Sequence, residues 1–291
     1  MRDFELLEPR SVPEASRMLI EHGEDARLLA GGTALLLALR QRLLTPSHVV
    51  FFGGIGGLND IRYDERNGLR LGPLVRHAEL AASPIVRSEV PMLADMAGRI
   101  ANPQVRSQAT LGGNLCYGDP ATDPPTCLIA LDAHVRLSGP DGERTLPLES
   151  FYVDYYETAL KRGEVLTEVM VPPLGPAAGA YTRFLKTPAE HRPLVGVGVV
   201  ARMEGRLCRE VRIAIGASTP FPVRARAAEE LLTGKIVTPD VLEEAAAMAA
   251  SDIEPLSDFR AQAEYRREMV KVVLRRTVAA LFDEPNEKLT P

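Results

Sequence analysis

Two glycine pairs, each set between an apolar run and a helix-like or polar segment, constrain this chain more than any other feature. They lie about 80 residues apart, in Leu28-Leu29-Ala30-Gly31-Gly32-Thr33-Ala34-Leu35 and Ala109-Thr110-Leu111-Gly112-Gly113-Asn114. Each apolar run can form a buried strand. The turns that follow can bring backbone N–H groups close to an anion, because glycine has no Cβ atom. The two segments together therefore predict a site that grips one diphosphate.

Either segment alone is better explained as an ordinary tight turn that needs glycine for its backbone angles. Two such turns, accompanied by the hydroxyl or amide groups of Thr33, Thr110 and Asn114, make a dinucleotide cofactor the leading interpretation. A side chain at any of the four glycines is expected to hold the diphosphate away.

The composition is typical of a globular protein without an excess of positive charge. Its 291 residues, 45% hydrophobic and 25% charged, favour two domains. A net charge of -5 argues against nucleic acid as a main partner. The arginines at positions 224, 226, 266 and 267 are expected on solvated helix faces. The start of the chain lacks the pattern of an export signal, and the longest apolar stretch is too short to span a bilayer, so we expect a cytoplasmic protein without a membrane segment.

Metal and nucleophile chemistry have no sequence support. The cysteines, at positions 116, 127 and 208, are too few and too scattered for a disulfide framework, a zinc site or an iron–sulfur cluster. No histidine pair has metal-ligand spacing, and no Gly-x-Ser-x-Gly elbow is present. We therefore expect no metal ligand and no catalytic side chain, and interpret Tyr152, Tyr155 and Tyr156 as packing residues.

Hydrophobic patterning predicts an α+β organisation in two parts. In the first, a helix capped by Thr33 is expected to run to about Leu43. Pro172-Pro173 and the small residues that follow mark the boundary, giving domains over 1–175 and 176–291. In the second, three antiparallel strands are expected at 181–185, 196–202 and 211–215, followed by helices. The last helix carries an apolar stripe: Val270, Val273, Leu274, Thr277, Val278 and Leu281.

Two charged residues are candidates for cofactor contacts outside the turns. Asp123, in a proline-stiffened loop after the second turn, could accept hydrogen bonds from ribose hydroxyls or could instead cap the helix or turn that follows. Lys186 could neutralise the cofactor or could be an ordinary surface lysine.

Because it has both glycine turns, the chain resembles the FAD-binding medium subunits of molybdenum hydroxylases, the family of carbon monoxide dehydrogenase and xanthine dehydrogenase. The second turn with its Asp-Pro-x-x-Asp loop is the most specific part. The likeness extends over nearly the whole chain and includes residues 163–169 and the C-terminal strands and helices.

The resemblance implies a two-lobed FAD-binding domain of the vanillyl-alcohol oxidase (PCMH) type, with lobes at about 1–57 and 58–175, and a C-terminal domain of a three-stranded antiparallel sheet plus helices. The residues that it assigns to the diphosphate and its neighbourhood are Ala30, Gly31, Gly32, Thr33 and Ala34 with Thr110, Leu111, Gly112, Gly113 and Asn114. The further contacts that it implies are Leu29, Leu35, Ile100, Ala101, Tyr117, Thr122, Asp123, Leu166 and Lys186.

The resemblance also implies partners and a role. A small [2Fe–2S] subunit would supply electrons drawn from a large molybdopterin subunit, in a dimer of heterotrimers, and this chain would pass them from non-covalently held FAD to an acceptor. Departures from the family pattern, Thr33-Ala34 for a common His-Ser and no aromatic residue in Arg192-Pro193-Leu194, leave the acceptor open. The alternatives are a self-sufficient flavin oxidase or reductase, and an assembly module without cofactor.

Overall fold

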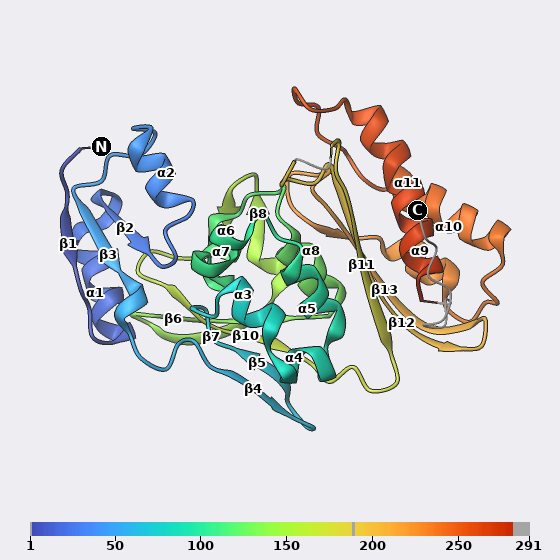
Figure 1. Ribbon diagram of the computed structural model, residues 1–291, viewed down its shortest axis with the longest axis horizontal. Helices are drawn as coiled ribbons and strands as arrows, with labels where there is room; N and C mark the ends of the chain where they lie inside the picture. The colour runs from blue at the N-terminus through green and yellow to red at the C-terminus, as the bar shows by residue number, and fades with distance from the viewer. Residues whose placement is uncertain (1, 188–189, 282–291) are drawn as a thin grey trace.

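The computed structural model describes residues 2–187 and 190–281, and Figure 1 shows three regions arranged in a row along its longest axis. The first region is a small parallel sheet of order β1-β3-β2 with helix α1 packed against it. Ser11 caps α1 through the Glu14 N–H, and Gly23 ends it at φ 55°. The elements are β1 (Glu5–Leu7), α1 (Val12–His22), β2 (Ala26–Leu29), α2 (Leu35–Arg40) and β3 (His48–Phe51).

The second region holds an antiparallel sheet of order β4-β5-β10-β6-β7. The Asn67-Gly68 turn joins its first two strands, with Asp64 paired to Gly68. The strands are β4 (Ile61–Asp64), β5 (Gly68–Leu71), β6 (His134–Gly139), β7 (Gly142–Pro147) and β10 (Val165–Val171), with a separate hairpin of β8 (Tyr152–Asp154) and β9 (Glu157–Thr158).

Short helices, several of which begin with proline in the first turn, cover one face of this sheet (Figure 1). Their apolar residues and those of the sheet form one continuous buried cluster that includes Leu93, Leu111 and Phe151. The helices are α3 (His77–Ala82), α4 (Pro84–Glu89), α5 (Pro91–Gly98), α6 (Pro103–Gln108), α7 (Leu111–Tyr117) and α8 (Asp123–Ala130).

The third region is an antiparallel sheet with helices on one face (Figure 1). The sheet has four strands rather than the three expected, because the short β14 pairs with the end of β13. The elements are β11 (Ala178–Phe184), β12 (Val195–Glu204), β13 (Leu207–Gly216), β14 (Val223–Arg224), α9 (Arg226–Leu232), α10 (Pro239–Ser251) and α11 (Ala263–Ala279). The apolar stripe predicted for the last helix is confirmed from Val270 to Val278, which are buried in this region's own core.

The expectation that the four arginines lie on solvated helix faces is wrong for two of them. Arg266 is 1% exposed and donates to the carbonyls of Leu194 and Ala217 and to Asp258. Arg224 forms a two-pronged ion pair with Glu229, whose carboxylate also accepts the Ile213 N–H. Both guanidinium groups therefore satisfy polar groups inside the C-terminal region.

The predicted helix after the first glycine turn is shorter than expected. α2 covers only Leu35–Arg40, and its N-cap residue is Ala34, which makes no side-chain capping bond. The prediction that Thr33 caps this helix is therefore wrong. In the described ranges 2–187 and 190–281, no helix has both the length and the apolar content needed to cross a bilayer.

Candidate functional site

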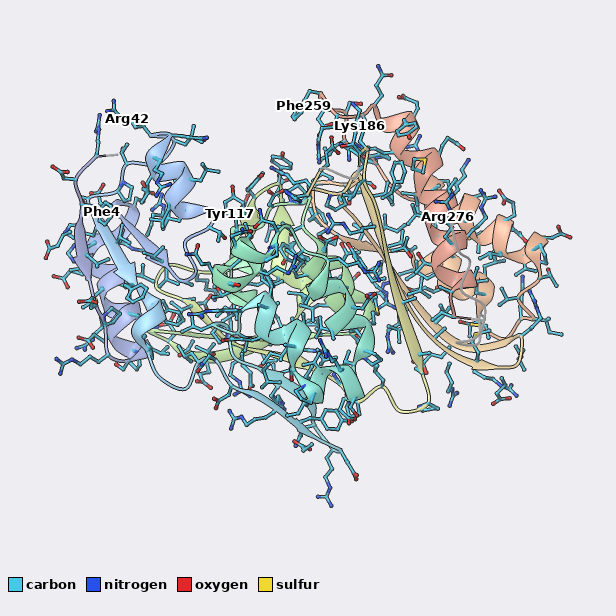
Figure 2. All side chains as sticks on the ribbon, in the orientation of Figure 1. Phe4, Arg42, Tyr117, Lys186, Phe259 and Arg276 are labelled. Carbon is cyan, nitrogen blue, oxygen red and sulfur yellow. The ribbon has the colours of Figure 1, made fainter. Side chains whose placement is uncertain are left out.

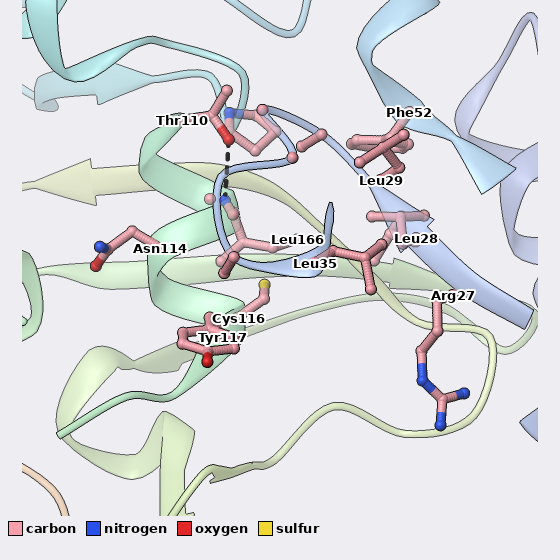
Figure 3. A pocket seen from close by; sticks show the side chains of 18 of the residues that line it. Arg27, Leu28, Leu29, Leu35, Phe52, Thr110, Asn114, Cys116, Tyr117 and Leu166 are labelled. Carbon is pink, nitrogen blue, oxygen red and sulfur yellow. Dashed lines mark hydrogen bonds between the residues drawn. The ribbon is translucent and has the colours of Figure 1, made fainter. Parts of the chain in front are cut away.

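A cavity of about 370 Å³ lies between the first region and the second and contains both glycine turns (Figure 3). Gly31 and Gly32 approach it from the loop between β2 and α2, and Gly113 and Asn114 approach it from the first turn of α7. The volume lies within the range of small-molecule sites. The central sequence prediction, that segments about 80 residues apart form one site, matches this arrangement.

The first turn presents unpaired backbone donors. The N–H groups of residues 31–35 have no hydrogen-bond partner among the residues that the structure describes, although the carbonyls of Gly32 and Ala34 accept bonds from α2. Consecutive free N–H groups ahead of a helix attract anions, because each donor is available and their dipoles add. This turn has the donors that a diphosphate needs.

The second turn differs from the expectation that both turns offer free backbone N–H groups to the diphosphate. Gly112 N–H donates to the Pro73 carbonyl at 2.8 Å, Gly113 N–H to Thr110 Oγ1 at 3.2 Å and Asn114 N–H to the Thr110 carbonyl at 3.0 Å. Thr110 is thus the N-cap of α7. The available polar group here is instead Asn114 Oδ1, which is buried without a partner among the described residues.

The glycines are required for a different reason from the one that the sequence suggested. A Cβ atom on Gly31 would lie 2.1 Å from the Gln108 carbonyl oxygen, and one on Gly112 would lie 2.5 Å from Pro73 Cβ. These side chains would strike the protein itself, because the two turns pack directly against their neighbours. The glycines therefore allow the segments that carry the cavity to approach one another.

Most of the predicted contact residues line the cavity. They are Leu29, Ala30, Gly31, Gly32, Thr33, Ala34, Leu35, Thr110, Gly112, Gly113, Asn114, Tyr117 and Leu166. The others, which lie outside its lining, are Ile100, Ala101, Leu111, Thr122, Asp123 and Lys186.

Three of these outlying residues have clear structural roles. Leu111 is fully buried in the core of the second region. The carbonyls of Ile100 and Ala101 accept hydrogen bonds from Arg106. Their role as cofactor contacts stays a prediction.

The carboxylate of Asp123 is buried between the second and third regions. It accepts a hydrogen bond from Tyr181 at 2.8 Å and pairs with Arg183 at 3.2 Å, and both partners come from β11. Burial raises the pKa of Asp123, while Arg183 and Tyr181 act to lower it. This geometry gives Asp123 a structural role that neither sequence interpretation included, namely joining α8 to the C-terminal sheet.

Asp123→Asn separates that structural role from a cofactor contact. Because the substitution leaves the Arg183 guanidinium buried without its counter-ion, we expect the apoprotein to lose about 1–3 kcal/mol of unfolding free energy. Urea denaturation without FAD measures this loss. An apoprotein of unchanged stability, combined with weaker FAD binding, would contradict the structural role and favour the ribose contact.

Lys186 lies away from the cavity. Its ammonium group donates to the Arg260 carbonyl at 3.2 Å, and Figure 2 shows it beside Phe259, apart from Tyr117. Thr122 also bonds locally, to the Asp119 carbonyl. Neither side chain lies among those around the glycine turns.

Sequence reasoning missed Arg27, the only cation among the described residues that line the cavity. Its guanidinium donates to the carbonyls of Glu24 and Ala26 and lies at one end of the site in Figure 3. The signal was available, because Arg27 and Leu29 are two residues apart in one strand and so share a face. The acidic lining residue Glu164 is neutralised by Arg144, whose hydrogen bonds lower the pKa of that carboxyl.

The residues present fit a dinucleotide. Residues 31–35, with their free N–H groups, and Asn114, with an unpartnered amide oxygen, both belong to the lining, and the walls formed by Leu28, Leu35 and Phe52 are apolar. In the described part of the chain, no group of three or more His, Cys, Asp or Glu side chains is placed to hold a metal ion.

The chain belongs to the family of FAD-binding subunits of molybdenum hydroxylases. Residues 2–174 match the family described as the FAD binding domain in molybdopterin dehydrogenase, and residues 180–281 match the carbon monoxide dehydrogenase flavoprotein C-terminal domain. The resemblance seen in the sequence is confirmed, and the chain is an oxidoreductase subunit with an FAD-binding domain.

Individual relatives align with this chain over nearly its whole length. The carbon monoxide dehydrogenase medium chain of Hydrogenophaga pseudoflava is 35% identical over 96% of this chain and 97% of its own. The nicotine 6-hydroxylase medium subunit of Paenarthrobacter nicotinovorans is 34% identical over 93% and 94%. A solved chain of the Hydrogenophaga enzyme, in a form that lacks the Mo-pyranopterin moiety of its molybdenum cofactor, superposes with a TM-score of 0.92 at 36% identity, over 96% of this chain and 97% of that one.

Proposed function

We propose that this chain is the electron-transfer subunit of a molybdenum hydroxylase, which binds FAD non-covalently in the cavity between the two glycine turns. The observation that carries the proposal is the run of unpaired N–H groups at residues 31–35, beside the helix α7 that Thr110 caps. Bound FAD accepts single electrons from iron–sulfur clusters and passes on one electron or a pair.

The chain's own residues supply binding and orientation. The N–H groups of residues 31–35 hold the diphosphate, Asn114 Oδ1 accepts a hydrogen bond from the ligand, and Arg27 adds a positive charge at one end. Apolar residues such as Leu29, Leu35 and Leu166 exclude water from the rest of the cavity. We propose the lobes at about 1–57 and 58–175 as its two sides, with the C-terminal domain at 176–291.

The relatives support the proposed partners, because they are medium chains or subunits of larger enzymes. We propose a [2Fe–2S] subunit as electron donor and a molybdopterin subunit as the site of substrate hydroxylation, assembled as a dimer of heterotrimers in the cytoplasm. The substrate belongs to the partner, and the acceptor is NAD, dioxygen, a quinone or another protein.

The alternative is a self-sufficient flavin oxidase or reductase of the same fold class. It requires a second pocket for an organic substrate. Turnover of an organic substrate by the purified single chain would favour this alternative over the proposal.

The test is the composition of the protein purified from its own host. We expect one FAD for each chain, release of free flavin on acid precipitation, and copurification of chains that contain iron and molybdenum. Flavin that stays with the precipitated chain would contradict non-covalent binding. A flavin-loaded chain without metal-containing partners would contradict the electron-transfer role.

A further inference from the structure

Three exposed tyrosine rings form a row at the edge of the cavity. Tyr117, which lines the cavity at the end of α7, packs edge-to-face against Tyr156 with ring centroids 5.3 Å apart. Tyr156 contacts Tyr155 in the same way at 4.8 Å. The latter two residues form the turn between β8 and β9, so this turn provides the packing partner of a cavity residue.

The backbone of this turn is held in an unfavourable conformation. Tyr156 has φ 59°, a region that bulky residues rarely adopt. Its Cα lies against Gly118, where an added Cβ atom would approach it to 3.3 Å. The turn is therefore kept in place by its contacts and not by the backbone preference of Tyr156 itself.

Arg192 supplies a further contact from the C-terminal side of the molecule. Its guanidinium donates to Asp119 Oδ1 at 2.6 Å and to the Tyr156 hydroxyl at 3.4 Å. Asp119 is 6% exposed, and the same oxygen accepts the Ala121 N–H. Arg192 thus links the segment before β12 to the loop after α7 and to the strained turn at once.

We propose that Arg192 is a positioning residue that holds Tyr156 against Tyr117 and so restricts the access of solutes to the cofactor. The proposal deepens and rests on the proposed function, because the restricted site is the FAD cavity. Without Arg192, the strained turn loses a charged tether, and Tyr117 loses the ring that fixes it at the edge of the cavity. Arg192 controls which molecules reach the flavin without touching it.

The first test measures access to bound FAD in the loaded full-length chain. Arg192→Gln is expected to raise the iodide quenching constant of flavin fluorescence at least about threefold, since local opening exposes the site. Arg192→Lys, which keeps the charge but not the planar guanidinium donor, should give an intermediate value. The control is Arg209→Gln, which removes an exposed pair with Glu204 in the C-terminal sheet. Equal quenching constants for Arg192→Gln and Arg209→Gln would overturn the proposal.

The second test does not need the cofactor. Tetranitromethane nitrates accessible tyrosines, and mass spectrometry locates the product. In the apoprotein, Tyr117 is expected to be nitrated faster in Arg192→Gln than in Arg209→Gln, and equal rates would overturn the proposal. A chain that takes up no FAD would refute the proposed function, while this labelling would still decide the role of Arg192.

Discussion

Gly31→Ala is expected to weaken FAD binding by about 10- to 100-fold, because a hydrogen bond to a charged group is worth about 1.5–3 kcal/mol. The added Cβ would lie 2.1 Å from the Gln108 carbonyl oxygen and 3.0 Å from Ala109 Cα. Both atoms belong to backbone, so one of the two segments must move. The movement displaces the N–H groups of residues 31–35 relative to Thr110 and Asn114. Titration of the apoprotein with FAD, followed by flavin fluorescence, measures the loss.

The matched control is Gly56→Ala. A Cβ atom at Gly56 meets nothing within 4 Å, so this variant adds the same methyl group and the same loss of backbone freedom without a collision. Its FAD affinity should equal that of the wild type. If Gly31→Ala binds FAD within about twofold of Gly56→Ala, the close approach of the turns does not shape the site.

Arg266→Met is expected to lower the unfolding free energy by about 1–3 kcal/mol for each buried carbonyl that loses its donor. The variant keeps most of the apolar stem but leaves the carbonyls of Leu194 and Ala217 without their charged donor. It also removes one of the groups that hold Asp258. Burial raises the pKa of that carboxyl, but hydrogen bonds from Ala261 N–H, Arg266 and Arg260 together lower it well below its ordinary value. Urea denaturation of the apoprotein measures the change.

Arg276→Met provides the comparison, because Arg276 is exposed on the same helix. It should change the unfolding free energy by no more than about 0.5 kcal/mol. Equal stabilities for the two variants would show that the buried guanidinium contributes nothing net to the C-terminal region.

The sequence could predict that the two glycine turns form one site, because each turn has a recognisable local pattern. Each segment has a glycine pair beside a helix start within eight residues, and this repetition suggested one ligand. The strand expected before the second pair is wrong, because Ala109 and Thr110 connect α6 to α7. That the Gly112 N–H is not free could not be predicted, because its acceptor is Pro73, which is distant in sequence from both turns.

For Arg266, the local helical period and the general preference of arginine for solvent predict different positions. Arg266 precedes Val270 by four residues and Val273 by seven, so the helical period places it on the buried stripe. The general preference of arginine for solvent predicts a surface position instead. Asp123 and Arg183 pose a different difficulty, because a contact between residues 60 apart in the sequence leaves no periodic signal.

The most direct test of the account is a crystal structure of the chain with FAD. We predict the diphosphate within hydrogen-bond distance of the N–H groups of residues 31–35, with Asn114 Oδ1 accepting a bond from the same ligand. FAD bound with its diphosphate elsewhere, and those N–H groups facing only solvent, would contradict the account.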